Sequence, residues 1–419
     1  MANSILTPTM ITREAARILH QSCNFVSNVN QQYDDRFAQT GAKIGTSLNV
    51  RMPSMYNVRT GAAISADDHV ERSTPLVVSS QWGVDVSFTT AELTMELDDF
   101  SERFLKPAMS KLAAKIEGQC LTIAKNRTAN YTNGTTNGLL NYRRYQQNGK
   151  NITQELAPRT DRTAILTPDS IVEFNDAVKG LFQDSSAISK QYKEGMMGRT
   201  GGFDVYENTL LPGHTNGTFA GSAVTDGTDQ WTSTTANVWV SQSTVDIDTA
   251  TSGTTLLAGD VITIANVYEV HPETKASTGR LRRFVVQSDV TLTTLATGGT
   301  VTVKPGIMYA SGNSFQNVFL DNTDSDGLAV TLIGAAGADF KNDLFFHKDA
   351  FMFGSADLED VSQYGAWGSR AVQDGMSIRI ARQYDISTDQ IPCRIDILWG
   401  FAELYPELAS KHLYETDLV

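Results

Sequence analysis

The chain has 419 residues, of which 41% are hydrophobic and 19% charged, and its net charge is -13. This length allows two or three domains, and the acidic balance argues against avid binding to duplex DNA, which needs clustered Lys and Arg. No apolar run reaches the roughly 20 residues that span a bilayer, and no secretory signal is evident, so we expect the chain to fold in a cytoplasm.

Residues 1–40 predict an extended arm. The residues that follow Thr12 predict a short helix over 12–19, with Thr12 as its N-cap. The residues expected on the buried face of this helix are Ala15, Ile18 and Leu19. The polar stretch 24–39 has little to bury on its own. We therefore expect the arm to need a neighbouring surface.

Residues 41–88 predict a protruding hairpin. Alternating patterns at 46–52 and 82–88 predict two strands, and the segment between them is long and charged. A hairpin with so little core is marginal alone and should lie against another surface. We expect the following residues to make contacts between subunits: Arg51, Arg59, Asp67, Asp68, Glu71, Arg72 and Trp82.

Residues 89–127 predict a short helical turn followed by a long helix. Apolar residues recur every four positions up to about Asn126, which gives a helix of roughly 40 Å. Leu112 and Ile116 should lie on its buried face, and Pro107 should bend or split it.

Residues 128–217 predict an α/β segment. Three Asn-Gly pairs, at Asn133, Asn137 and Asn148, predict that turns and loops dominate as far as residue 162. Beyond that point we expect a strand at 163–167, a helix at 169–182, a helix near 186–197 and a strand at 201–206.

Residues 218–342 predict an all-β domain inserted into the α/β segment. Short runs rich in β-branched residues alternate with turn residues at the spacing of a sandwich or small barrel. The ends of the insert, at Asn216-Gly217 and near Lys341, should lie close together. Residues 343–419 then return to the host domain and supply its last strands. The whole chain therefore predicts an α+β protein.

No arrangement of residues predicts an enzyme, a metal site or a cofactor site. The three cysteines and six histidines are scattered, with no CxxC, HExxH, GxSxG or Walker pattern. The glycine-rich segment Gly195–Gly202 precedes a strand, so it is a connector in our interpretation. Asp321–Gly327 lacks the closing Glu of a calcium loop and is interpreted as a solvated turn. We interpret His214 as a turn residue and Trp231 as a core aromatic.

Nine short segments resemble the coat proteins of short-tailed bacteriophages that carry an inserted immunoglobulin-like I-domain. They are Leu6–Glu14, Gln32–Phe37, Gly41–Gly45, Phe88–Thr94, Leu97–Phe100, Gly259–Tyr268, Phe346–Phe351, Arg382–Ile386 and Pro392–Asp396. The resemblance covers essentially the whole chain, and its last two segments are the most specific.

This resemblance implies the major-capsid fold shared by tailed bacteriophages and herpesviruses. Its parts would be an N-arm at 1–40, an E-loop with P-domain strands at 41–88, a short helix and spine helix at 89–127, a P/A-domain at 128–217, an I-domain at 218–342, and an A/P-domain return at 343–419.

The function implied is that of a major capsid protein, which self-assembles into an icosahedral shell around a double-stranded DNA genome. Its implied partners are copies of itself in pentamers and hexamers, a scaffolding protein and a portal, and assembly would take place in the host cytoplasm. The alternative is a non-enzymatic carbohydrate- or cell-binding β-domain protein of a phage particle. That alternative accounts for the insert but not for the arm and the long helix.

Overall fold

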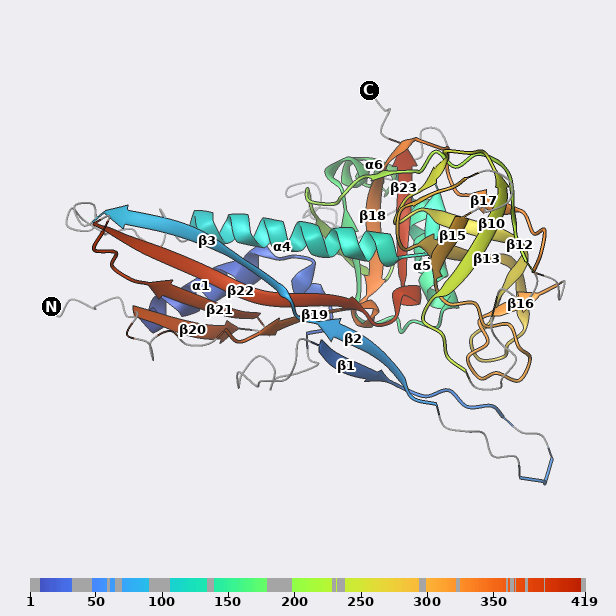
Figure 1. Cartoon of the computed structure of the whole chain (residues 1–419), viewed down its shortest axis with the longest axis horizontal. Coiled ribbons are helices and arrows are strands. Elements are labelled where there is room, and N and C mark those ends of the chain that lie inside the picture. Colours follow the sequence, from blue (N-terminus) through green and yellow to red (C-terminus); the bar gives the residue numbers. More distant parts are fainter. Residues whose placement is uncertain are drawn as a thin grey trace. The chain divides into compact units, whose positions relative to one another are not determined.

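The computed structural model describes most of the chain. The described residues are 8–31, 47–58, 61–64, 70–89, 106–133, 139–178, 198–227, 231, 238–293, 299–321, 325–358, 361, 365, 367–373, 376–387 and 389–415. They form two compact units, which we describe one at a time (Figure 1). The first unit consists of Met1–Val50, Ser73–Leu121 and Phe351–Leu404, and the second of Arg51–Arg72, Thr122–Ala350 and Tyr405–Val419.

The first unit is built on a five-stranded antiparallel sheet. Its strands are β3 (Ser80–Thr89), β19 (Phe351–Ala356), β20 (Trp367–Gln373), β21 (Met376–Arg382) and β22 (Gln390–Glu403). The order is β19-β22-β21-β20, and β3 pairs with β22 over ten residues, from Gln390 opposite Thr89 to Trp399 opposite Ser80. The strand predicted at 82–88 is confirmed.

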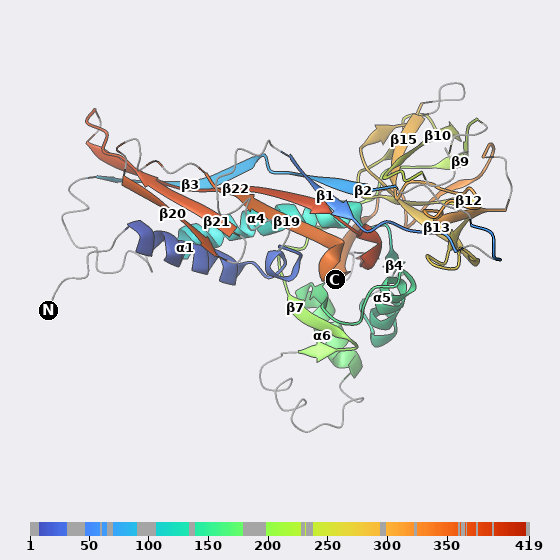
Figure 2. The ribbon, with the colours of Figure 1, turned by 90° about the horizontal axis from the view of Figure 1, so that it is seen from below.

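Helix α1 (Pro8–Ser22) packs against β20 and β21 (Figure 2). It begins at least four residues before the predicted start, so Thr12 lies inside the helix and the predicted N-cap is wrong. Proline is well suited to the first helical turn because it lacks only an N–H that has no partner there. Ala15, Ile18 and Leu19 are buried as predicted.

Helix α4 (Lys106–Arg127) is the long predicted helix, and the division between the two units falls within it. Leu112 and Ile116 are buried, as predicted. Pro107 lies in the first turn of the described helix, and the predicted bend or split at this residue stays a prediction because residues 90–105 lie outside the described residues. The upstream part of the prediction, including the short turn after Thr89, lies outside the described residues.

Strands β1 (Ser47–Met52) and β2 (Arg72–Val77) pair as a separate two-stranded sheet. They form the base of the predicted hairpin, whose loop is described at 53–58, 61–64 and 70–71.

In the second unit, the host part is a seven-stranded mixed sheet with the order β4-β23-β18-β5-β7-β6, and β8 pairs with β18. Its strands are β4 (Tyr131–Asn133), β5 (Arg162–Leu166), β6 (Arg199–Thr200), β7 (Phe203–Glu207), β8 (His214–Thr215), β18 (Asp339–His347) and β23 (Ala409–Glu415). Pairing is parallel between β4 and β23 and between β5 and β7. Helix α6 (Pro168–Val178) fits the prediction at 169–182 as far as it is described.

Helix α5 (Tyr142–Gln154) contradicts the prediction that turns and loops dominate residues 127–162. Asn141 caps it, because its side-chain oxygen accepts a hydrogen bond from the backbone N–H of Arg144 at 2.9 Å. The Asn148-Gly149 pair lies inside this helix and not in a turn. A side chain at Gly149 would place its Cβ only 3.2 Å from the ring of Phe203, so the glycine allows a close approach of helix and sheet.

The inserted residues form a closed antiparallel barrel. Its sheet has the order β16-β12-β13-β15-β10-β9, and β17 pairs with β12. The strands are β9 (Gly221–Thr225), β10 (Ser243–Ala250), β12 (Val261–Val270), β13 (Ser277–Val286), β15 (Gly299–Lys304), β16 (Val318–Leu320) and β17 (Val330–Leu332). A bridge between Val224 and Ala329 closes the ring from β9 back to the start of β17. Strands β11 (Thr255–Leu256) and β14 (Val290–Thr291) form a small second sheet.

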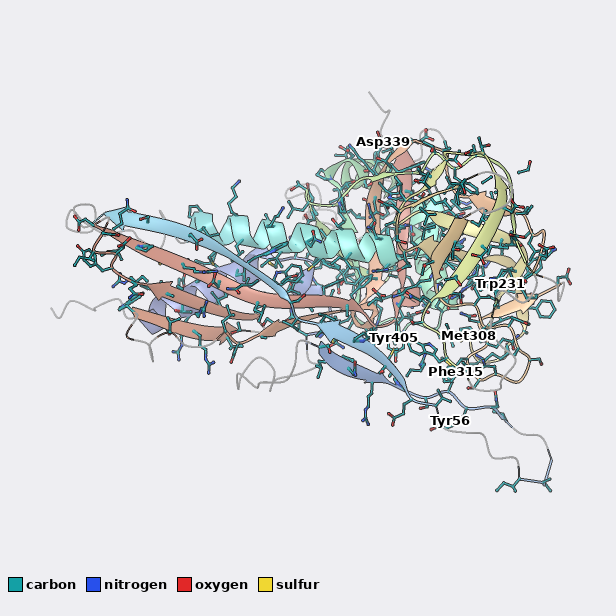
Figure 3. All side chains as sticks on the ribbon, in the orientation of Figure 1. Tyr56, Trp231, Met308, Phe315, Asp339 and Tyr405 are labelled. Carbon is teal, nitrogen blue, oxygen red and sulfur yellow. The ribbon has the colours of Figure 1, made fainter. Side chains whose placement is uncertain are left out.

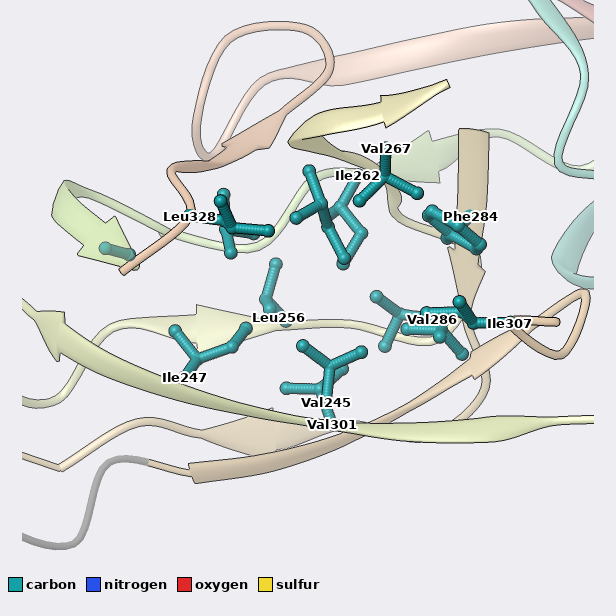
Figure 4. Close-up of a cluster of buried hydrophobic side chains, with 14 of the residues drawn as sticks. Val245, Ile247, Leu256, Ile262, Val267, Phe284, Val286, Val301, Ile307 and Leu328 are labelled. Carbon is teal, nitrogen blue, oxygen red and sulfur yellow. The ribbon is translucent and has the colours of Figure 1, made fainter. Parts of the chain in front are cut away.

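The barrel has a hydrophobic core of its own (Figure 4). The core includes Val245, Ile262, Phe284 and Val301, all fully buried, and Trp231, which confirms the prediction for that residue. Alternate residues of twisted strands fill the interior of small barrels in this way.

The two ends of the insert lie side by side, as the sequence predicts. The N–H of Asn216 donates to the carbonyl of Ala338 at 3.0 Å, and the N–H of Gly337 donates to that of Gly217 at 3.0 Å. A Cβ at Gly217 would lie 2.2 Å from the carbonyl oxygen of Thr255, so only glycine fits at this neck. The last four residues of the predicted insert, 339–342, belong to host strand β18.

All three cysteines are buried and unpaired, as expected for ordinary core residues. Among the described residues, no helix combines the length and apolar character needed to cross a bilayer.

We predict that residues 216–338, expressed alone, fold cooperatively, because they contain the described strands, the core and both closing hydrogen bonds of the barrel. Substituting the fully buried Ile262 by Asp should abolish this folding, since an unpaired charge would enter the core. Circular dichroism during thermal unfolding measures both. A fragment without a cooperative transition would show that the barrel depends on the host sheet for its fold.

Candidate assembly surfaces

The charged residues of the predicted hairpin have different environments. Arg51 and Glu71 are exposed and form a loose ion pair, with 3.7 Å between Nε and Oε2. Exposed pairs of this kind contribute little to stability and leave both side chains available to a partner. Arg59, Asp67 and Asp68 lie outside the described residues.

Arg72 is buried and held within its own unit. Its Nε and Nη2 atoms donate to the carbonyl of Pro53 at 3.2 and 2.8 Å. Its guanidinium also lies 5.5 Å from the ring centre of Phe315 in the barrel and 5.9 Å from that of Tyr405 (Figure 3 labels both aromatic residues). A planar guanidinium can lie over aromatic rings and donate from two nitrogen atoms to one carbonyl, and the ammonium group of lysine cannot do both. Arg72 therefore fastens the base of the hairpin.

The loop of the hairpin also carries exposed apolar side chains, which were not among the contact residues predicted from the sequence. Tyr56 is 69% exposed, Val58 94% and Ile64 89%, and Met55 is exposed as well. Figure 3 shows Tyr56 on this loop. Single exposed apolar residues are common on protein surfaces, but here four lie within ten residues of one loop. The signal was present in the sequence but was masked by the charges around it.

Trp82, on β3, is half-buried. Its ring meets that of Trp399 edge-on, with 5.0 Å between ring centres, and the Nζ atom of Lys115 lies 6.0 Å from it. Trp82, Val84 and Val86 are all half-buried and alternate with exposed residues, so the predicted face exists.

We predict that Arg72→Glu lowers the free energy of unfolding of the unassembled protein by about 2–4 kcal/mol, because it removes two hydrogen bonds and two ring contacts. Arg51→Glu, with the same change of charge at an exposed position, should alter it by less than about 0.5 kcal/mol. Urea denaturation of both variants measures the difference. Equal effects would mean that Arg72 does not fasten the hairpin.

A network of buried charged groups joins the barrel to the host sheet. His214 is buried in β8, where its Nε2 atom lies 2.8 Å from Oδ1 of Asp260 in the barrel. The other oxygen of Asp260 accepts from the N–H groups of Gly217 and Leu257, at 3.1 and 2.8 Å. His214 is thus a buried strand residue, and the prediction of a turn residue is wrong.

Two buried lysines extend this network. The Nζ atom of Lys125 donates to the carbonyl of Gly213 at 2.9 Å and lies 3.4 Å from Nδ1 of His214. The Nζ atom of Lys411, on β23, donates to the carbonyl of Gly259 at 2.9 Å, directly before Asp260. A neutral His214 with its proton on Nε2 satisfies both neighbours, because it donates to Asp260 and accepts from Lys125.

Burial governs the ionisation of these groups. Burial lowers the pKa of Lys411 to about 7 and that of Lys125 to about 8, while attraction to Asp260 opposes both shifts. Burial also lowers the pKa of His214, against the effect of its hydrogen bond to Asp260. The histidine is therefore neutral at pH 7 although it contacts a carboxylate.

A second set of contacts fixes strand β13 of the barrel to the host. Arg282 donates from Nη1 to Glu155 at 2.9 Å, and both side chains are buried. Burial raises the pKa of Glu155 to about 7, although Arg282 opposes the shift. The neighbouring Arg283 lies 4.6 Å from the ring centre of Tyr131 and donates to its carbonyl at 3.1 Å. Breaking such a buried pair by removing one partner is strongly destabilising.

We predict that stability increases with pH between 7.5 and 8.5, because Lys411 holds its proton up to a pKa of about 10.5 when unfolded but only to about 7 when folded. The folded chain then binds fewer protons, which favours it by up to about 1.4 kcal/mol per pH unit for one group. At higher pH the three buried cysteines oppose this trend, because burial raises the pKa of each thiol above its ordinary value of 9.0. Lys411→Met should reduce this slope, and Lys111→Met, at an exposed position, should not. Urea denaturation between pH 7.5 and 8.5 measures it, and equal slopes in all three proteins would contradict the assignment.

Within the described ranges, no group of three or more His, Cys, Asp and Glu residues could hold a metal ion. The buried charged side chains described above join the barrel to the host sheet, and the loop of the hairpin exposes apolar side chains.

Comparison with known proteins identifies one family. The model of the family described as "P22 coat protein - gene protein 5" matches residues 28–414. A solved chain of Mycobacterium phage Che8 is 10% identical, with 92% of this chain and 89% of that chain covered and a TM-score of 0.46. The capsid of Ralstonia phage GP4 is 6% identical, with 90% and 85% covered and a TM-score of 0.42. The CUS-3 coat protein I-domain is 27% identical, with 27% of this chain and 96% of that chain covered and a TM-score of 0.19. Among curated proteins, none matches.

Proposed function

This chain belongs to the P22 coat protein family, and we propose that its copies associate into the pentamers and hexamers of an icosahedral shell. Membership makes the chain a structural major capsid protein and a component of the bacteriophage virion. The observation that carries this conclusion is the extent of the match, which includes the host sheets and the inserted barrel together. The alternative of a carbohydrate- or cell-binding β-domain protein accounts only for the barrel, so we do not pursue it.

The hairpin loop is our proposed contact between copies. Its exposed apolar residues, Met55, Tyr56, Val58 and Ile64, would be covered by a neighbouring subunit. Arg51 and Glu71 remain proposed contacts at its base because both are exposed, and Arg59, Asp67, Asp68 and Trp82 remain proposed with them. Arg72 supports assembly only indirectly in this proposal, because its side chain is engaged within its own subunit.

We further propose that a scaffolding protein and a portal take part in assembly in the host cytoplasm, and that the shell encloses double-stranded DNA without sequence-specific binding. The net charge of -13 supports a shell that does not bind its DNA tightly, since tight binding to the phosphate backbone needs many clustered Lys and Arg residues. The protein would work without catalysis or cofactors. Many weak contacts closed into a shell give high stability by multivalency.

We predict that the double variant Tyr56→Ser and Val58→Ser raises the protein concentration needed for assembly at least about tenfold, because apolar surface no longer leaves water between copies. Its unfolding free energy should be unchanged, since both side chains are exposed. Analytical ultracentrifugation measures the shift from large particles to monomers.

The matched control is Val172→Ser, at another exposed valine, on α6 and outside the hairpin. It should assemble as the wild type does. A double variant with wild-type sedimentation would remove the hairpin loop from the contact.

A further inference from the structure

A cavity of about 630 Å³ lies within the second unit, between α5 and the barrel. One wall is the face of α5 with its C-terminal end, another is the Gly201-Gly202 turn between β6 and β7, and the third comes from β12, β13 and the residue that follows β12. Its size is that of sites that enclose a small molecule or several side chains. Its lining includes Lys150, Gln154, Leu156, Arg159, Arg162 and His271.

Two cations of the cavity have no carboxylate partner in the described part of the chain. Lys150 and Arg159 both line the cavity and are exposed, and neither takes part in any ion pair found among the described residues. Arg162 is different, because it is buried and donates to the carbonyls of Pro158 and Ala157. The unengaged positive charge of the cavity is therefore that of Lys150 and Arg159.

Two further polar groups of the lining can donate hydrogen bonds. The Nδ1 atom of His271 accepts from two backbone N–H groups, those of Glu273 and Thr274, at 3.3 Å each. A neutral ring therefore carries its proton on Nε2 and is a donor there. The Oε1 atom of Gln154 is buried without a hydrogen-bond partner among the described residues. Turning this amide over presents its NH₂ group instead.

Leu156 adds an apolar and strained position to the lining. Its φ angle of 63° is in the left-handed region, at the place after a helix where glycine is usual. The N–H of Leu156 donates to the carbonyl of Thr153 and that of Ala157 to the carbonyl of Ile152, which completes the usual helix ending. A leucine here costs free energy that a glycine would not, and its side chain is 44% exposed. Strain of this kind at a cavity points to a role beyond the fold.

We propose that this cavity binds a carboxylate side chain, together with its apolar stem, from a second copy of this chain. Lys150 and Arg159 would hold the carboxylate by charge, His271 and Gln154 would donate to it, and Leu156 would contact the stem. The inference rests on the proposed self-assembly and names one of its contact sites.

Charge balance favours a second copy as the source. Each chain has 47 acidic against 34 basic residues, so like chains repel one another unless carboxylates of one meet unengaged cations of another. The one carboxylate of the lining, that of Glu269, accepts from Arg280 at 2.8 and 2.7 Å, so Lys150 and Arg159 remain for a carboxylate of another copy. A free small anion is the competing occupant and is one outcome of the test below.

The test is chemical cross-linking of amines to carboxylates that are in contact in assembled particles. Equal amounts of ¹⁴N- and ¹⁵N-labelled full-length protein are assembled together and treated with a carbodiimide, which forms an amide directly between a lysine and a contacting Asp or Glu. Mass spectrometry then identifies the peptides joined to Lys150. We expect Lys150 joined to an acidic peptide of the other label. Lys150 joined only within one label, or left unjoined in intact particles, would overturn the inference and leave self-assembly standing. The absence of particles would contradict the proposed function itself.

The double variant Lys150→Met and Arg159→Met measures the contribution of the site. It should raise the concentration needed for assembly about tenfold, the effect of two exposed charge pairs. The control, Arg143→Met with Lys111→Met, makes the same change of charge at exposed positions outside the cavity and should have a smaller effect. Added inorganic phosphate that binds wild-type monomers, without any joined peptide, would show an anion site that does not serve assembly.

Leu156→Gly separates a structural from a binding role. If Leu156 contacts the stem of the bound side chain, the variant should unfold at the same or a higher temperature as a monomer, because the strain is relieved, and yet assemble less readily. A monomer that melts lower, with assembly altered only in proportion, would make Leu156 a structural residue and remove it from the site.

Discussion

The arrangement of the second unit depends on buried charge at the neck of the barrel. Asp260 of the barrel contacts His214, and the carbonyl of Gly259 accepts from Lys411. Ions taken out of water are costly unless their partners are fixed, so this network specifies one position for the barrel on the host sheet. A purely apolar neck would bury as much surface but would tolerate sliding. The pair of Arg282 with Glu155 adds a second fixed point between the barrel and the host.

This arrangement divides the tasks within the chain. The barrel supplies its own core, and the host sheet holds it by polar contacts, so the two can be altered independently. The hairpin is also held at its base by polar contacts. Arg72 fixes this base, while the apolar side chains of the loop remain exposed. When a partner covers apolar residues on a loop whose base is already fixed, the loop loses little conformational entropy. Such a contact is suited to a particle in which the same contact forms many times.

Much of the fold could be predicted from sequence, because the strands of the barrel and the buried face of α4 follow simple periodicities. Helix α5 could not, since Asn148 and Gly149 are typical of turns. In the helix, the NH₂ group of Asn148 donates to the carbonyl of Arg144, and its side-chain oxygen accepts from Thr132 and Ser410, which are distant in sequence. The neck was missed for a similar reason: Lys125, His214, Asp260 and Lys411 are far apart in the chain, and no local pattern brings them together. Arg72 was placed among exposed charges because its aromatic partners lie more than two hundred residues away.

The claim that this protein acts by self-association can be tested by electron microscopy of the purified full-length protein, incubated at increasing concentration with and without a scaffolding partner. If the protein acts by self-association, closed shells or ring-shaped capsomers of uniform size should form, with the barrel as a separate density on each subunit. Uniform particles of the size of a single chain at every concentration, with the partner present, would contradict it.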